Sequence, residues 1–239
     1  NLIKDGKVTK WQAAQLLRGL RQFQVGKYTL QDQLGGNETG RVYLAEHGKL
    51  GRKVALKLLP RRFASDPTIV KRFLAEARIA ASIDHRSIMH VYDVDRENDQ
   101  VFIVTEYVDG VTLNKFVAAN RPSLSHALRI FSQLLEGLTI AQDKGVVHGG
   151  LRPSTILIDG QGSAKICDLG VASLTEPGNK ANDESAEFSP DALHYAAPER
   201  AQEAPSLPSD MYALGGILYL MLTGQEFKSA WKTSDPSKS

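Results

Sequence analysis

Two charged residues in apolar surroundings carry the first chemical signal in this sequence. Lys57 alternates with apolar residues in "RKVALKLL", so its ammonium group must reach solvent or find an anion. Glu76 lies on the helical stripe that should face the core, together with Ile69 and Phe73. A buried Lys57–Glu76 ion pair would satisfy both side chains, although each could instead extend its charged end to water.

Three glycines and two aspartates provide further signals. Gly35, Gly36 and Gly40 fall in a strand-turn-strand segment, where glycine lets backbone N–H groups approach phosphate oxygens. The same glycines are compatible with an ordinary hairpin. Asp168 follows the apolar strand "AKIC" and precedes Leu-Gly, which places a carboxylate at a strand end. Asp210 opens an apolar helix, and a carboxylate at that place can accept hydrogen bonds from the backbone N–H groups of the helix N-terminus.

The elements that must position these residues begin with an antiparallel sheet. Short β-type runs broken by turns fill residues 28 to 59, and two more strands are predicted near 89–95 and 101–107. Asp66-Pro67 supplies an N-cap and a first-turn proline, and the apolar spacing that follows predicts a helix over 67–82. The first part of the chain is therefore mostly antiparallel sheet plus one helix.

Helices dominate the second half. One is predicted to end at Lys144-Gly145, with glycine in the C′ position. The segment "SDMYALGGILYLMLTG" at 209–224 is apolar on nearly all faces, which predicts a buried helix. Residues 174–193 are polar and predict a mobile loop, and the final "KTSDPSKS" predicts a frayed end.

A short amphipathic helix is predicted over residues 9–20. Thr9 and Gln12 form a capping-box pattern at its start. Its apolar face should pack inward and brace the domain, with a partner-binding helix as the alternative. That face consists of Ala13, Leu16, Leu17 and Leu20.

Composition excludes several classes of protein. Apolar residues make up 42% and charged residues 23% of the 239-residue chain, which argues against disorder. The net charge is +2 and no stretch forms a basic block, so nucleic-acid binding is not expected. The single cysteine, Cys167, allows no internal disulfide and favours a reducing compartment. No apolar run is long enough to insert into a membrane.

The order of these features resembles the protein-kinase signature set. The match covers about residues 28 to 224 and is most similar to bacterial Ser/Thr kinases of the multidomain type. The matching segments, in order, are the glycine-rich turn, VALK at 54–57, Glu76, TEYVDG at 105–110, HGGLRPSTILI from 148, DLG at 168–170, APE at 197–199 and the helix at 209–224.

The resemblance implies an α+β, two-lobed kinase fold. Residues 1–27 would form an N-terminal helical extension, and residues 28–105 an N-lobe of antiparallel sheet plus one helix. Residues 106–239 would form a mainly helical C-lobe, truncated after the buried helix that the family calls αF.

ATP and Mg²⁺ are the ligands that the resemblance implies. Lys57 would contact the α- and β-phosphates and be held by Glu76, and Asp168 would hold Mg²⁺. Glu106 and Val108 would offer hinge backbone groups to adenine. The predicted ATP-binding set is Leu34, Gly35, Gly36, Gly40, Val42, Ala55, Lys57, Glu76, Glu106, Val108, Leu157 and Asp168.

The catalytic loop departs from the family pattern H-R-D-L-x-x-x-x-N. Gly150 stands at the position of the aspartate base and Thr155 at that of the metal-binding asparagine, so no catalytic residue is intact. Gly149 replaces the arginine that would pair with a phosphorylated activation loop. Arg152 keeps a positive charge where the family carries lysine. In the phosphate loop, Glu38 should repel nucleotide and weaken its binding.

These departures predict a pseudokinase. It would bind ATP weakly and act as a signalling scaffold or allosteric regulator of another protein, which could be a kinase, a substrate or a signalling partner. One alternative is a low-activity or atypical Ser/Thr kinase whose base comes from elsewhere, such as an acidic residue of the 183–191 loop. Another is a nucleotide-independent scaffold in which Lys57–Glu76 is a structural ion pair. The chain is expected to be cytoplasmic, on its own or as part of a larger membrane-anchored protein.

Overall fold

The computed structural model describes residues 2–37, 40–97, 100–169, 190–201 and 203–228. The chain forms two compact units. Unit 1 comprises Asn1–Ala81 and His90–Val108, and unit 2 comprises Ser82–Met89 and Asp109–Ser239.

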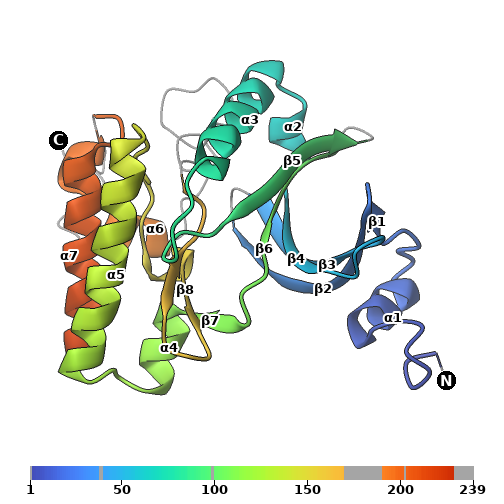
Figure 1. Ribbon diagram of the computed structural model, residues 1–239, viewed down its shortest axis with the longest axis horizontal. Coiled ribbons are helices and arrows are strands. Elements are labelled where there is room, and N and C mark those ends of the chain that lie inside the picture. The colour runs from blue at the N-terminus through green and yellow to red at the C-terminus, as the bar shows by residue number, and fades with distance from the viewer. Residues whose placement is uncertain (1, 38–39, 98–99, 170–189, 202, 229–239) are drawn as a thin grey trace, which may run out of the picture. The chain divides into compact units, whose positions relative to one another are not determined.

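Unit 1 is built on a six-stranded antiparallel sheet in the order β1-β2-β3-β4-β6-β5 (Figure 1). The alternating run forms β3, whereas the inner strands β4 and β6 each carry four consecutive buried residues, because side chains on both of their faces are covered. Leu56, Phe102 and Val104 lie in the core of this unit with at most 1% of their surface exposed. The strands are β1 (Gln24–Val25), β2 (Tyr28–Asn37), β3 (Gly40–His47), β4 (Lys53–Leu58), β5 (Val91–Glu97) and β6 (Gln100–Glu106).

The predicted helix after Asp66 is confirmed as α3 (Pro67–Ala81). The Asp66 carboxylate accepts the backbone N–H of Thr68 at 2.8 Å, so it caps the helix as expected. Its buried face holds Phe73 and Ala77, at most 2% exposed. A one-turn helix, α2 (Arg61–Ala64), precedes it and was not predicted.

The first helix corrects the sequence-based expectation. The capping box of Thr9 and Gln12 is present, but α1 (Lys10–Leu17) ends before Leu20, and its leucines do not pack inward. Leu17 is 92% exposed, whereas Gln12 is 7% exposed and donates from Nε2 to the Leu30 carbonyl at 2.7 Å. A polar side chain takes the inner position because it can donate a hydrogen bond to the Leu30 carbonyl of β2, which a leucine cannot.

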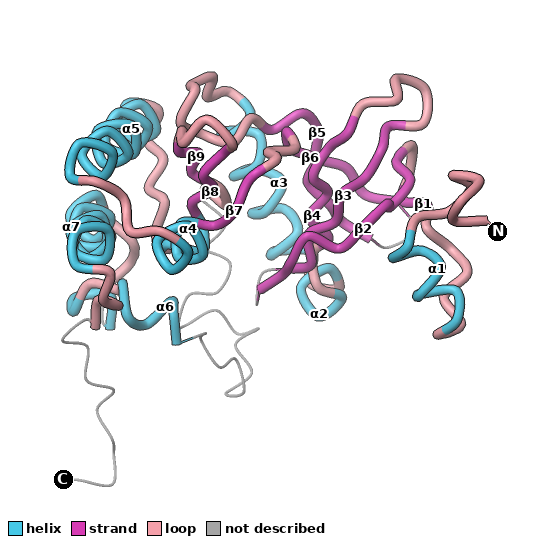
Figure 2. Tube along the Cα trace, turned by 90° about the horizontal axis from the view of Figure 1, so that it is seen from below, coloured by secondary structure: helices cyan, strands magenta, loops and turns pink. Residues whose placement is uncertain are grey.

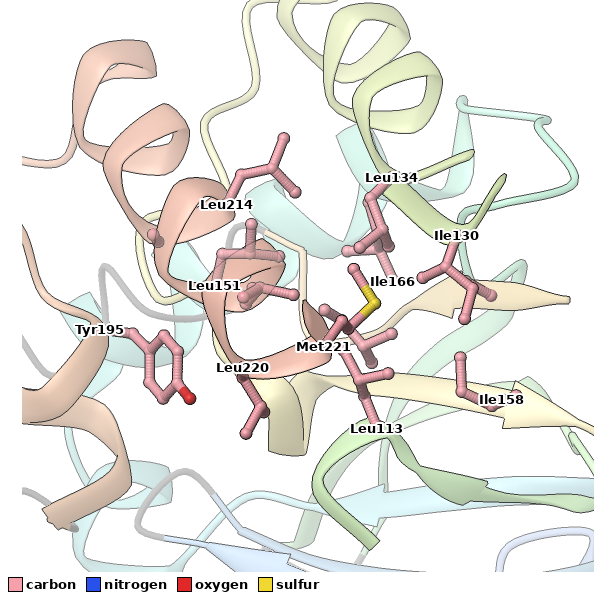
Figure 3. Packing of buried hydrophobic residues seen from close by; sticks show 14 of the residues in the cluster. Leu113, Ile130, Leu134, Leu151, Ile158, Ile166, Tyr195, Leu214, Leu220 and Met221 are labelled. Atoms are coloured by element: carbon pink, nitrogen blue, oxygen red, sulfur yellow. The ribbon is translucent and has the colours of Figure 1, made fainter. Parts of the chain in front are cut away.

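Unit 2 combines helices with a small sheet. Helices α5 (Leu124–Asp143) and α7 (Leu207–Thr223) lie side by side (Figure 2), and the three-stranded sheet has the order β7-β8-β9. Figure 3 shows the core, where Ile130, Leu134, Ile158, Ile166 and Met221 converge. The smaller elements are β7 (Gly110–Thr112), α4 (Leu113–Ala119), η1 (Pro153–Thr155), β8 (Ile156–Asp159), β9 (Ala164–Ile166), α6 (Pro190–Tyr195) and η3 (Pro198–Ala201).

Both long helices end as their sequences predict. Helix α5 stops before Gly145, which adopts φ +73°, and α7 is capped by Gly224 at φ +72°. The burial predicted for all faces of α7 is too high, because Tyr219 and Leu222 are 42% and 41% exposed.

The polar segment over 174–193 is predicted to be a loop. For its last residues this prediction is wrong. Residues 190–195 form α6. Pro190 is its first residue, and the negative charge of Asp191 in the first turn interacts favourably with the helix dipole. Residues 174–189 and the predicted frayed end at 232–239 lie outside the described residues. Within the described part of the chain, no helix has the length and apolar character needed to cross a membrane.

Candidate nucleotide-binding and catalytic-loop residues

Strand register in unit 1 aligns the glycine-rich turn with Lys57. Val42 on β3 pairs with Gly35 on one side and with Lys57 on the other. Because directly opposed residues share a sheet face, the Val42 and Lys57 side chains lie on the same surface. Gly40 is required by packing, since a Cβ at that position would lie 2.2 Å from the Leu58 carbonyl oxygen.

Lys57 is enclosed by the sheet, with 6% of its surface exposed. Ala55, two residues earlier on the same face, is 8% exposed. Glu76 is half-buried on α3, the helix that the sequence predicted to carry it. The Lys57–Glu76 ion pair itself remains a prediction.

Glu106 ends β6 and is tied to residue 90. Its Oε1 accepts the backbone N–H of His90 at 2.9 Å, and its own N–H donates to the His90 carbonyl at 2.9 Å. This double connection fixes the end of the strand just before Val108, the other predicted hinge residue. Leu34, predicted at the edge of the ATP site, is 45% exposed.

In unit 2, Asp168 is held in an uncommon backbone conformation. It has φ +59° and is the one non-glycine residue with positive φ among the described residues. Such conformations are costly for residues other than glycine and concentrate at functional sites. Leu169, buried with Ile83 and Ile88, anchors the following position. Leu157 on β8, the other predicted ATP contact of unit 2, is half-buried.

Asp210 holds the backbone of the catalytic loop by two hydrogen bonds. This carboxylate, 2% exposed, accepts the backbone N–H of His148 at 2.8 Å and that of Gly149 at 2.9 Å. The prediction that Asp210 caps its own helix is therefore wrong, because these partners lie more than sixty positions away. Gly149 has φ +74°, which glycine adopts without steric cost.

The His148 ring connects the loop to the strand that precedes Asp168. Its Nε2 lies 3.0 Å from the Cys167 carbonyl, and its Nδ1 accepts the Gly150 N–H at 3.2 Å. Only a neutral ring protonated on Nε2 satisfies both bonds. Burial lowers the pKa of His148 below its ordinary value, which favours that form. Burial also raises the pKa of Asp210.

The hydroxyl at the predicted metal-ligand position is engaged elsewhere. Thr155 Oγ1 donates to the Arg152 carbonyl at 2.9 Å and accepts the Arg152 N–H at 3.1 Å. Its side chain therefore closes the η1 turn. Within the described residues, no cluster of three or more His, Cys, Asp or Glu side chains could hold a metal ion.

Asp191 joins the catalytic loop through a contact that the sequence did not specify. Its Oδ2 lies 3.5 Å from Arg152 Nε and accepts a short hydrogen bond from Ser154 Oγ. Arg152 Nε also donates to Ser154 Oγ at 3.0 Å. The sequence-based alternative proposed an acidic residue of the 183–191 loop as a base, without identifying which one. The arginine, the serine and the carboxylate thus form one polar cluster, which we call the 152–154–191 cluster.

The predicted residues divide between the two units. Unit 1 contains Leu34, Gly35, Gly36, Gly40, Val42, Ala55, Lys57, Glu76, Glu106 and Val108, and unit 2 contains Leu157, Asp168, Gly150 and Thr155. Their roles in ATP and Mg²⁺ binding remain predictions.

A model of the protein kinase domain family matches residues 28–238. This chain belongs to the protein kinase family. This chain is 37% identical over 202 residues to Serine/threonine-protein kinase PrkC of Bacillus subtilis, and the match covers 84% of this chain and 31% of that relative. It is 32% identical over 206 residues to Serine/threonine-protein kinase PknB of Mycobacterium tuberculosis, covering 83% of this chain and 33% of that relative. The chain spans about a third of the length of both relatives.

A solved kinase structure gives the same result. A mutant of the PknI kinase domain from Mycobacterium tuberculosis matches with a TM-score of 0.67 and 26% identity, over 86% of this chain and 77% of that chain. The predicted α+β kinase fold is confirmed, with an antiparallel-sheet N-lobe and a helical C-lobe.

Two glycines of unit 2, Gly149 in the catalytic loop and Gly160 after β8, should respond differently to substitution. Replacing Gly149 with alanine places a Cβ at φ +74° and should lower the free energy of unfolding by about 1–2 kcal/mol. Gly160→Ala is the matched control, because its φ is not positive and its Cβ would meet no atom within 4 Å. Urea unfolding of both variants measures the difference, and equal stability would show that position 149 imposes no backbone constraint.

Proposed function

We propose that this kinase domain is a pseudokinase that binds nucleotide and regulates another protein by its conformation. The observation that carries the proposal is the state of the catalytic loop. Gly150 offers no carboxylate at the base position, and the Thr155 hydroxyl is occupied by two hydrogen bonds to Arg152. The backbone frame of that loop is nevertheless held by Asp210. A well-ordered loop without its proton acceptor suits a binding domain better than a phosphotransferase.

The unit 1 residues fit a nucleotide by their chemistry. A buried lysine on the sheet face next to a glycine-rich turn supplies the cation and backbone donors that phosphates need. Lys57 would bind and orient the phosphates, and the backbone near Glu106 and Val108 would hold the base. Asp168 would provide the carboxylate for Mg²⁺, which neutralises phosphate charge when bound. We propose that Glu38 weakens this binding without abolishing it.

The kinase homology indicates that the partner is a protein. The relatives are named as serine/threonine-protein kinases, and we propose that this chain likewise acts on or with a protein. The regulated protein would be a kinase, a substrate or a signalling partner. We further propose that the chain works in the cytoplasm. It would consist of an N-terminal helical extension over residues 1–27, an N-lobe over 28–105 and a C-lobe over 106–239.

Binding and transfer should separate experimentally. Millimolar Mg²⁺-ATP should raise the Tm of the chain, because a ligand that binds the folded state stabilises it by about 1.4 kcal/mol at ten times its Kd. Lys57→Met should remove the shift, whereas Lys53→Met, on the exposed start of the same strand, should keep it. No labelled phosphate should reach the chain itself or a generic substrate. Phosphate transfer that Lys57→Met abolishes would overturn the proposal, and no Tm shift would favour a nucleotide-independent scaffold.

A second candidate function is a slow Ser/Thr kinase that uses Asp191 as its base. The 152–154–191 cluster favours it, because it brings a carboxylate to the catalytic loop that lacks one. The Asp191 side chain is 28% exposed, so its oxygens are accessible to a hydroxyl from solvent. A general base must lie within hydrogen-bond reach of the proton it accepts, and typically contributes about 10²- to 10⁴-fold.

A single-turnover assay with labelled Mg²⁺-ATP decides between the two candidates. If Asp191 is the base, the wild-type chain transfers phosphate slowly, and Asp191→Asn lowers that rate by about 10²-fold or more. Glu203→Gln, which changes an exposed acidic residue nearby in the sequence, should leave the rate unchanged. A wild-type rate at background, or a rate insensitive to Asp191→Asn, excludes Asp191 as the base.

A further inference from the structure

Exposed apolar side chains concentrate at the N-terminal end of unit 1. Of the fifteen large hydrophobic residues that are exposed in the described part of the chain, five lie between residues 2 and 20. Leu17 is the extreme case at 92% exposed. The others are Leu2 at 55%, Ile3 at 40%, Leu16 at 40% and Leu20 at 44%. Clusters of exposed hydrophobic residues often mark surfaces that bind a protein, a membrane or a ligand.

Basic residues surround these side chains. Residues 1–27 contain six of the 29 Lys and Arg residues of the chain but one of its 27 Asp and Glu residues, so this segment is net +5 while the rest is net −3. Lys4, Lys7, Lys10, Arg18 and Arg21 are all exposed. We call this combination of basic and apolar side chains the N-terminal basic-apolar surface.

The opposite side of α1 is fixed to the sheet. Thr9 Oγ1 donates to the Gln31 carbonyl at 2.6 Å, and Gln12 Nε2 donates to the Leu30 carbonyl at 2.7 Å. The Trp11 ring packs edge-to-face on Phe23, with centroids 5.7 Å apart. Because these contacts hold the inner side of the helix, Leu17 cannot turn inward without breaking them. The leucines of this segment are therefore exposed while these contacts hold, and they are available to a partner.

We propose that the N-terminal basic-apolar surface docks on an anionic lipid bilayer. Leucines that alternate with lysines and arginines suit a bilayer interface, where apolar side chains enter the acyl boundary and cations stay among the headgroups. The charge of this segment complements anionic lipid, and a planar bilayer demands no groove or shape match. Docking of this kind is peripheral and requires no membrane-spanning helix. It does not depend on nucleotide binding or phosphotransfer.

Vesicle sedimentation with the whole 239-residue chain tests the proposal. The chain should co-sediment with phosphatidylcholine vesicles that contain roughly 30 mol% phosphatidylglycerol, and much less with pure phosphatidylcholine. Raising the salt from about 0.05 M to about 0.5 M should weaken binding, because it screens the headgroup charge. Lys7→Gln with Lys10→Gln should lower the partition coefficient by about tenfold or more.

Apolar variants separate insertion from charge alone. Leu17→Ser removes a side chain that makes no core contact, so the chain should fold as before and bind the anionic vesicles about tenfold more weakly. Leu124→Ser is the matched control, since Leu124 is 63% exposed in unit 2. The proposal is overturned if the wild-type chain does not bind anionic vesicles, or if both serine variants bind equally. It is also overturned if sedimentation velocity shows a dimer that Leu17→Ser dissociates, because a second copy then covers the surface.

Discussion

The Asp210 carboxylate is the contact on which the organisation of unit 2 depends. It lies in the first turn of α7 and accepts the N–H groups of His148 and Gly149, with 2% of the residue exposed. Hydrogen bonds to a buried charge are worth about 1.5–3 kcal/mol each. The His148 ring extends the connection to Cys167, the residue before Asp168. One buried carboxylate thus couples α7, the catalytic loop and the strand that carries the predicted metal ligand.

This arrangement explains how the loop can keep its backbone conformation without the aspartate and asparagine of the family pattern. The bonds that hold it come from the backbone of His148 and Gly149, and no carboxylate at position 150 takes part in them. Glycine at 149 adopts φ +74° without the strain that an arginine would carry there. Thr155 closes the η1 turn by bonding the backbone of Arg152, so its hydroxyl has a structural role. The hydrogen bonds that hold this loop therefore do not require a carboxylate at position 150 or an amide at position 155.

The sequence predicted the elements whose determinants are local. Helix α3 followed from the Asp66 cap and from the apolar spacing after it. Prediction from the sequence failed where a contact joins residues that are far apart along the chain. Gln12 is buried because it finds a carbonyl eighteen positions away, and Asp191 reaches Ser154 across thirty-seven positions. Such partners depend on the assembled fold, so neither the inward glutamine nor the 152–154–191 cluster could be read from periodicity.

In the proposed function, phosphotransfer is absent because of two side chains, those at positions 150 and 155, while the backbone of the loop keeps its hydrogen bonds. The most direct measurement is single-turnover phosphate transfer from Mg²⁺-ATP by the Gly150→Asp, Thr155→Asn double variant. Gly150 has no positive φ, so an aspartate there meets no backbone penalty. The account predicts transfer at least about 10²-fold above a wild-type background, with Gly150→Ala, Thr155→Asn remaining at background. A wild-type chain that transfers phosphate as fast as the double variant would contradict it.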